Sequence, residues 1–276
     1  MKWSWILILS LLSCNSDSSV KTVVFEAEES PVFVTEIDSS LLLQLEHVME
    51  SIGLVELISI DNTIHIDLKY ATSDNFMGVQ LYDTLTRLFL QKGVALRLSE
   101  SQAYLDSIYP GYSLLVYDGV RPQQVQQEMW DALDSIPTYR RGKFVSNPKN
   151  GSVHNFGSAV DLTIVNAQGD ILDMGAGYDD FRAIAFPSHE ARFLKSGELT
   201  QQQYKNRKLL RKVMKHSGFY NIPSEWWHFN AYSRTSASNK HQMLLTESGG
   251  STWFRIPCKT DSSSDSLIKP AQDAIN

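Results

Sequence analysis

The chain has 276 residues, of which 42% are hydrophobic, enough for one substantial core or two small ones. Its 31 acidic and 25 basic side chains give a formal charge of −6, which argues against a nucleic-acid partner. Only two cysteines occur, Cys14 and Cys258, so a scaffold held together by several disulfides is excluded.

The amino terminus has the pattern of an export signal. A short basic start precedes an apolar run over residues 3–12, which is too short for an ordinary membrane span. The following Leu11-Leu12-Ser13-Cys14 resembles the lipobox of bacterial lipoproteins, in which the cysteine is acylated and becomes the first mature residue. We therefore predict a lipoprotein signal over residues 1–13 and a lipid on Cys14. The alternative is a plain signal peptide that contains a cysteine.

These features predict an exported protein that is anchored by lipid to a bacterial membrane and faces the periplasm or the cell surface. Residues 14–40 are polar and acidic and are predicted to form a tether. About 24 flexible residues reach roughly 25–30 Å, enough to hold a domain away from a membrane. We expect one folded domain over residues 41–235 and a C-terminal extension over 236–276, whose Ser- and Asp-rich end is predicted to be disordered.

The folded region mixes two hydrophobic periods. Helical patterns occur at residues 41–52, within 84–108, between Pro122 and Pro137, and at 200–216. Strand patterns occur at residues 63–68, 112–117, 159–165 and 226–232. Because helices and strands do not alternate strictly, the predicted fold class is α+β, a single domain with a mainly antiparallel sheet flanked by helices.

Two short stretches far apart in the chain look like halves of one metal site. Residues 152–161 contain two candidate ligands, His154 and Asp161, and residues 225–228 contain His228 and a spare carboxylate. A catalytic zinc ion keeps three protein ligands, leaves a fourth position for water, and needs a base beside that water. His154, Asp161 and His228 suit the ligand role, and the chain is predicted to be a zinc hydrolase.

The spacing of these residues supports the same chemistry. Gly157 and Ser158 are small enough to allow the turn that returns a loop histidine to a carboxylate on the following strand. Glu225 is expected where a loop enters the last strand, beside the metal-bound water, as general base and later as acid to the leaving amine. A lone histidine or an isolated Glu-x-x-His is usually structural, so the combination of the two stretches carries the prediction.

The pattern Ser-x-His-x-x-Gly-x-Ala-x-Asp followed by Glu-x-Trp-His is similar to that of the zinc peptidases related to D-alanyl-D-alanine carboxypeptidases, which have the hedgehog-type fold. Three further segments resemble the D-alanyl-D-alanine dipeptidases of the vancomycin-resistance type. They are Asp-Leu-Lys-Tyr-Ala-Thr-Ser-Asp-Asn-Phe at residues 67–76, Tyr-Asp-Gly-Val-Arg-Pro at 117–122 and Pro-Ser-Glu-Trp-Trp-His-Phe at 223–229. The resemblance covers residues 53–231 and implies a zinc site in a central cleft.

The resemblance implies hydrolysis of D-alanyl-D-alanine to free D-alanine with one Zn²⁺ per chain, in cell-wall dipeptide turnover. It implies that Arg121 binds the carbonyl oxygen and stabilises the oxyanion, whereas the alternative for Arg121 is a salt bridge to Asp118 or another acid. It also implies substrate-side positions for Tyr70 and Ser152, and a contact between Asp179 and the substrate ammonium group.

The implied partners are a small peptide substrate and, through the lipid, a membrane; no protein partner is implied. One alternative is a D,D-carboxypeptidase or endopeptidase that acts on peptidoglycan stem peptides and needs an open groove for a long substrate. Another is a non-catalytic wall-binding lipoprotein. Such a protein would tolerate loss of the base, yet Glu225 and Arg121 are both present.

Overall fold

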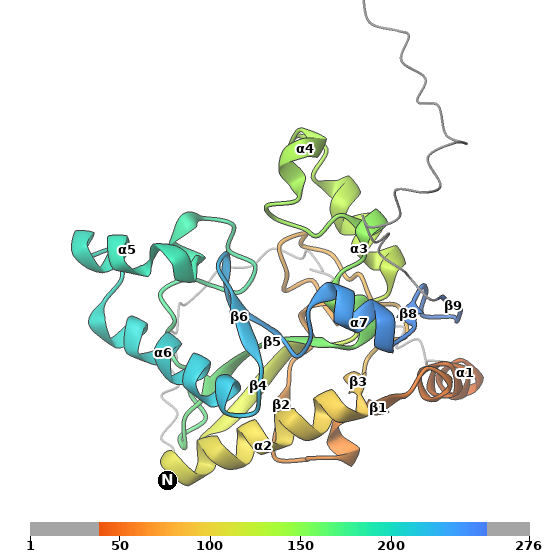
Figure 1. Ribbon diagram of the computed structural model, residues 1–276, viewed down its shortest axis with the longest axis horizontal. Helices are drawn as coiled ribbons and strands as arrows, with labels where there is room; N and C mark the ends of the chain where they lie inside the picture. The colour runs from red at the N-terminus through yellow and green to blue at the C-terminus, as the bar shows by residue number, and fades with distance from the viewer. Residues whose placement is uncertain (1–38, 253–276) are drawn as a thin grey trace, which may run out of the picture. The chain divides into compact units, whose positions relative to one another are not determined.

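The structure, a computed structural model, describes residues 39–252 (Figure 1). The predicted export signal, the lipidation site at Cys14, nearly all of the predicted tether and the tail beyond residue 252 lie outside the described residues. Among residues 39–252, no helix is both long and apolar enough to span a membrane.

A five-stranded sheet in the order β2-β4-β5-β7-β6 carries the candidate site (Figure 1). Its strands are β2 (His65–Ile66), β4 (Ser113–Asp118), β5 (Ala159–Val165), β7 (Glu225–Asn230) and β6 (Tyr220–Ile222). Only β2 and β4 pair in parallel, and the other neighbours are antiparallel. The central strand β5 is buried along its whole length, which explains its apolar sequence. The predicted α+β class with a mainly antiparallel sheet is confirmed.

Two long helices, α2 (Lys92–Ile108) and α6 (Gln201–His216), pack together against the sheet (Figure 1). A capping box starts α6: the Thr200 hydroxyl accepts from the Gln203 N–H, and the Gln203 side chain accepts from the Thr200 N–H. The main core lies between these helices and the sheet. It includes Val94, Leu98, Leu105, Leu114, Val116, Leu162, Ile164, Leu210, Val213 and Met214.

A second core lies under the amino-terminal elements and α3 (Gln123–Ala132). It joins α1 (Ser39–Ser51) to the two-stranded sheet of β1 (Leu54–Glu56) and β3 (Phe89–Gln91), which pair antiparallel. Leu45, Met49, Leu54, Phe89 and Met129 are among its buried side chains. The remaining helices of the described residues, apart from short 3-10 turns, are α4 (Thr138–Arg141), α5 (Glu190–Ser196) and α7 (Arg234–Lys240).

Part of the predicted C-terminal extension packs on the turn that carries His154. Strand β8 (Met243–Leu244), which pairs with β9 (Ser251–Thr252), places Met243 in a small cluster with Phe156 and Ala237. The backbone of residue 245 also accepts a hydrogen bond from the Gln124 N–H at 3.0 Å. This segment therefore packs against the turn that carries His154. The domain boundary at residue 235 stays a prediction.

Several predicted elements are shorter in the structure than their patterns suggested, and the helix predicted between Pro122 and Pro137 ends at Ala132. The helical pattern at residues 84–108 begins only at Lys92, because Phe89–Gln91 pair with β1 and the Gln91 N–H donates to the Gly157 carbonyl at 3.0 Å. The strand pattern at 63–68 is realised over two residues only. At residues 89–91 strand pairing between distant segments outweighed the local helical pattern.

Gly157 ends the turn that carries His154 in a left-handed conformation, at φ 60° and ψ 30°. A Cβ atom there would lie 2.4 Å from Leu54 Cδ2 and 3.2 Å from the Gln91 backbone nitrogen. Gly157→Ala should cost about 1–2 kcal/mol for the backbone conformation and about 1–3 kcal/mol for overpacking. Thermal unfolding measures the loss. The matched control is Gly197→Ala, where φ is +80° but nothing lies within 4 Å. Equal losses in both variants would contradict the close-packing argument.

Candidate active site

The register of three strands places three polar side chains in a row on one face of the sheet. Asp161 on β5 lies opposite Asp118 on β4 and opposite His228 on β7. Side chains of directly opposed residues project from the same face. Their neighbours Val160 and Phe229 form the next pair and belong to the core behind the sheet. Residues separated by more than forty positions in the sequence therefore meet because of strand register.

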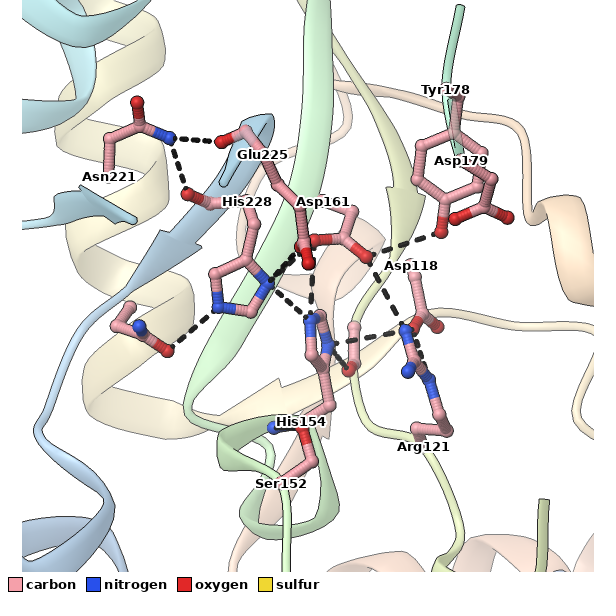
Figure 2. A network of polar contacts seen from close by, with 12 residues as sticks. Asp118, Arg121, Ser152, His154, Asp161, Tyr178, Asp179, Asn221, Glu225 and His228 are labelled. Atoms are coloured by element: carbon pink, nitrogen blue, oxygen red, sulfur yellow. Dashed lines mark hydrogen bonds and ion pairs between the residues drawn. The ribbon is translucent and has the colours of Figure 1, made fainter. Parts of the chain in front are cut away.

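His154 reaches this row from a short 3-10 turn, Val153–Phe156, rather than from a strand. Ser152 caps the turn: its hydroxyl accepts from the His154 N–H at 3.4 Å, while its own N–H donates to the Asn155 side chain at 2.6 Å. His154 Nε2 lies 3.0 Å from His228 Nδ1 and 3.3 Å from Asp161 Oδ1. His228 Nδ1 lies 2.9 Å from Asp161 Oδ1, so the three atoms form a compact triangle (Figure 2).

The outer nitrogens of both imidazoles are fixed by acceptors. His154 Nδ1 donates to the Gly119 carbonyl at 2.7 Å, and His228 Nε2 donates to Asn230 Oδ1 at 3.0 Å. In the neutral tautomers that these contacts favour, each inner nitrogen carries a lone pair, so two lone pairs and a carboxylate oxygen face one another. A cation satisfies all three. Tetrahedral zinc bonds of about 2.0–2.2 Å place ligand atoms about 3.3–3.6 Å apart, so the triangle needs to widen by only a few tenths of an ångström to hold zinc.

Asp161 offers one oxygen to the triangle, and its other oxygen is held from behind. The Tyr178 hydroxyl lies 3.2 Å from Oδ2 and Arg121 Nη2 lies 3.4 Å from it. Burial raises the pKa of Tyr178 well above its usual value, so the phenol stays protonated and donates. Burial alone would raise the pKa of Asp161 too, but positive charge on His154 and His228 outweighs burial and holds that pKa far below its usual range, as a cation bound in the triangle would.

Arg121 is buried and rigidly held at the edge of the cavity. Its Nε and Nη2 donate to Asp118 Oδ2 at 2.9 and 2.6 Å, and its Nη1 donates to Gln126 at 3.0 Å. The ring of Tyr70 lies 4.8 Å from the guanidinium carbon. Burial opposes the charge, yet Asp118 outweighs it and raises the pKa of Arg121. The salt bridge weighed as the alternative interpretation is present, and it orients a permanently charged group toward the cavity.

Glu225, the first residue of β7, lies beside the triangle without joining it. Its Oε2 atom is 3.8 Å from His228 Nδ1, one of the inward-facing nitrogens. Burial is the main cause that raises the pKa of Glu225 to about 7, and His228 opposes the shift. A carboxyl group in that range can both accept and return a proton near neutral pH.

Asp179 lies away from the triangle, with both carboxylate oxygens 3.1 Å from the Tyr70 hydroxyl. Burial first and then the charge of Asp161 raise the pKa of Asp179 to about 7. Its backbone has φ 57°, a left-handed value that Asp tolerates. Figure 2 shows Asp179 and His228 on either side of Asp161.

The structure brings every catalytic, metal-binding and substrate-binding residue predicted from the sequence to one cavity of about 180 Å³. The lining includes Tyr70, Arg121, Ser152, His154, Asp161, Asp179, Glu225 and His228. This volume is small beside the roughly 300–1,000 Å³ of pockets for drug-sized ligands, and it suits a small substrate. The roles of these residues in catalysis and binding stay predictions.

Sequence reasoning missed the groups that hold the proposed ligands, namely Tyr178, Asn230 and the carbonyl of Gly119, and it missed Gln126, which holds Arg121. It named Asp118 only as a possible partner of Arg121, although the Tyr82 hydroxyl also donates to it at 2.7 Å. The only sequence signal for these groups was that some of them neighbour predicted site residues: Gly119 lies in the same short segment as Arg121, and Tyr178 precedes Asp179. None of these residues has a spacing typical of metal ligands.

Comparison with known proteins identifies the family of this chain. The family described as D-ala-D-ala dipeptidase matches residues 50–244. D-alanyl-D-alanine dipeptidase of Escherichia coli (strain K12) is 37% identical over 176 residues, 64% of this chain and 83% of that protein. The dipeptidase of Enterococcus faecalis is 34% identical, over 59% of this chain and 83% of that protein. That of Enterococcus faecium is 31% identical, over 64% and 91% respectively.

Tyr178→Phe removes the hydroxyl that donates to Asp161 while keeping the ring. We expect zinc affinity to fall roughly 10-fold. Loss of a hydrogen-bond partner of a metal ligand typically lowers metal affinity about 10- to 100-fold. Competition with a chromogenic chelator measures the dissociation constant without any assay of activity. The matched control is Tyr117→Phe, whose ring packs 5.0 Å from that of Tyr178. An unchanged zinc affinity in Tyr178→Phe would contradict the assigned contact.

Asp179→Asn should make the protein more stable at alkaline pH. The folded-state pKa of Asp179, about 7, lies above the ordinary value, so ionisation opposes folding fully above pH 7 and less as the pH falls toward 4. Asn also tolerates the left-handed backbone. Each kcal/mol gained should raise the melting midpoint by about 2–4 °C. Melting curves at pH 8 and pH 5 should show the larger gain at pH 8, and a larger gain at pH 5 would reverse the predicted sign.

Proposed function

The chain belongs to the D-ala-D-ala dipeptidase family of zinc metallopeptidases, and we propose that it hydrolyses free D-alanyl-D-alanine to two molecules of D-alanine. The observation that carries this proposal is the set of charges in one small cavity. Three inward-facing ligand atoms, the carboxyl group of Glu225 and the carboxylate of Asp179 all line about 180 Å³. The preference for D-residues is taken from the named activity of the relatives.

We propose His154, Asp161 and His228 as the ligands of one zinc ion per chain. When bound, zinc supplies a water of lowered pKa and polarises the peptide carbonyl. The chain's own groups fix the ligands for this task. Gly119 and Asn230 hold the two imidazoles in the tautomers that turn lone pairs inward, and Tyr178 holds the far oxygen of Asp161.

Glu225 is the proposed general base. It takes a proton as the water oxygen bonds to the carbonyl carbon, and it returns a proton to the amine nitrogen as the C–N bond breaks. The products are one D-alanine that carries the new carboxylate and one that carries the new amino group. The distance of 3.8 Å between Glu225 Oε2 and His228 Nδ1 supports this role, because it keeps the carboxyl group beside the ligand set.

Arg121 is the proposed oxyanion partner. Its charge is permanent and its orientation is set by Asp118 and Gln126 before substrate binds, so little reorganisation is needed as negative charge develops. Ser152, at the start of the His154 turn, also lines the cavity and is the proposed neighbour of the substrate backbone.

Asp179 is the proposed site for the substrate ammonium group. Tyr70 fixes its carboxylate through two 3.1 Å contacts. An ammonium ion placed there favours the ionised carboxylate, and an acylated amine lacks the charge that this site recognises. Recognition of the free amine supports a dipeptide as substrate over a long stem peptide.

We propose that the protein acts outside the cytoplasm, as a lipid-anchored enzyme that meets dipeptide released during cell-wall turnover. The sequence of the first fourteen residues supports this placement. The physiological consequence would be recycling of, or nutrition from, wall-derived D-alanine.

Glu225→Gln should retain zinc and lose about 10²–10⁴-fold in kcat on D-alanyl-D-alanine, because an amide cannot take the proton. Release of free D-alanine is measured with and without a chelator, and zinc content is measured on the same samples. The wild type should release D-alanine from the dipeptide and lose this activity with chelator.

Parallel incubation with a peptidoglycan pentapeptide separates the alternatives. Cleavage of the pentapeptide alone would instead support the carboxypeptidase or endopeptidase alternative. Full activity of zinc-loaded Glu225→Gln would exclude the assigned base.

A further inference from the structure

The proposed substrate carries two charges, and the roles proposed above give a protein partner only to the positive one. A free dipeptide at neutral pH has an ammonium group at one end and a carboxylate at the other. Asp179 accounts for the ammonium group. A buried carboxylate without a cation or hydrogen-bond donors would be costly, so the cavity needs a second charged contact.

Two arginines line the cavity, Arg121 and Arg234. Arg121 is already neutralised by Asp118 and lies 3.4 Å from Asp161. Arg234 is exposed, and within residues 39–252 its side chain makes no hydrogen bond or ion pair. The other ionisable groups of the lining, besides the two histidines of the triangle and the phenol of Tyr70, are the carboxylates of Asp161, Asp179 and Glu225. With Arg121 assigned to the oxyanion and paired with Asp118, Arg234 is the cation of the described lining that is left for the terminal carboxylate.

The backbone fixes Arg234 on the His228 side of the site. It is the first residue of α7, four positions after Asn230, the residue that holds His228 Nε2. The connection between β7 and α7 is anchored at Ala231, whose N–H donates to the Ser158 carbonyl at 2.9 Å and whose carbonyl accepts from Arg97 at 3.1 Å. Since Asp179 and His228 lie on either side of Asp161 in Figure 2, a substrate that spans the triangle from Asp179 extends toward this connection.

Asn230 can assist from the same side. Its Oδ1 atom accepts the His228 proton, so its amide nitrogen points its two hydrogens elsewhere, and that nitrogen has no partner among the described residues. Asn230 also lines the cavity. A guanidinium and an amide donor together match the two oxygens of a carboxylate, which arginine binds in a bidentate manner.

We propose that Arg234, assisted by Asn230, binds the terminal carboxylate of the substrate. The assignment rests on the proposed dipeptidase function and deepens it. Asp179 would bind the free amino group and Arg234 the free carboxylate, so the two side chains together would select substrates that are dipeptides. Peptides extended at the carboxyl end, and substrates with a neutral carboxyl end, would be disfavoured.

The test compares D-alanyl-D-alanine with D-alanyl-D-alanine amide, in which the terminal carboxylate is neutral. Release of D-alanine gives kcat/KM for the zinc-loaded wild type and for Arg234→Gln. We expect the variant to lose roughly 10- to 100-fold on the dipeptide, the range of a charged hydrogen-bonded contact. On the amide, its loss should stay within about 3-fold. Arg234→Lys should recover part of the preference for the free acid.

The matched control is Lys240→Gln, which removes a cation from the same helix, outside the cavity lining. It should hydrolyse both substrates at the wild-type rate. Zinc content, measured on every variant, separates binding of the carboxylate from damage to the metal site.

Equal losses on the dipeptide and the amide, or no loss on the dipeptide, would overturn the carboxylate site while leaving the dipeptidase function intact. A wild type that hydrolyses neither substrate would overturn the proposed function and this site with it. Loss confined to the dipeptide, with zinc content unchanged, is the result expected.

Discussion

Two imidazole nitrogens and a carboxylate oxygen, held within 3.3 Å of one another, form the constraint on which the site depends. Without a cation, the inner faces of two neutral imidazoles and a carboxylate repel one another. The Gly119 carbonyl and Asn230 maintain this arrangement by binding the outer nitrogens. A metal of zinc's size and ligand preference would remove this repulsion between the three groups, so the fold and the metal are expected to stabilise each other.

Much of the surrounding structure holds this triangle in place. The register of β4, β5 and β7 aligns Asp118, Asp161 and His228, while a capped turn brings in His154. Asp118 connects the groups behind the triangle, because it accepts from Tyr82 and Arg121. Removing any one of these contacts would loosen a ligand or the oxyanion partner without touching the metal itself.

The charges of the cavity are arranged by position as well as by sign. Carboxylates surround the triangle, and burial raises the pKa values of Glu225 and Asp179 into the neutral range. The two arginines differ in their state: Arg121 is neutralised and oriented before substrate binds, whereas Arg234 is free among the described residues. A substrate with one charge at each end fits this distribution, and the proposed specificity follows from it.

The sequence was enough to predict the α+β class, which the structure confirms, and to propose the ligand types and the base, because Gly157 between His154 and Asp161, and Glu225 three residues before His228, are local patterns. Helices such as α6 were also predictable from their apolar period and cap. Only the tertiary structure decided which groups stand behind the ligands. Tyr178, Asn230 and the Gly119 carbonyl act through contacts that depend on strand register and loop closure, which leave no fixed spacing in the chain. The same holds for Arg234, whose lack of a partner among the described residues becomes visible only when its neighbours in space are known.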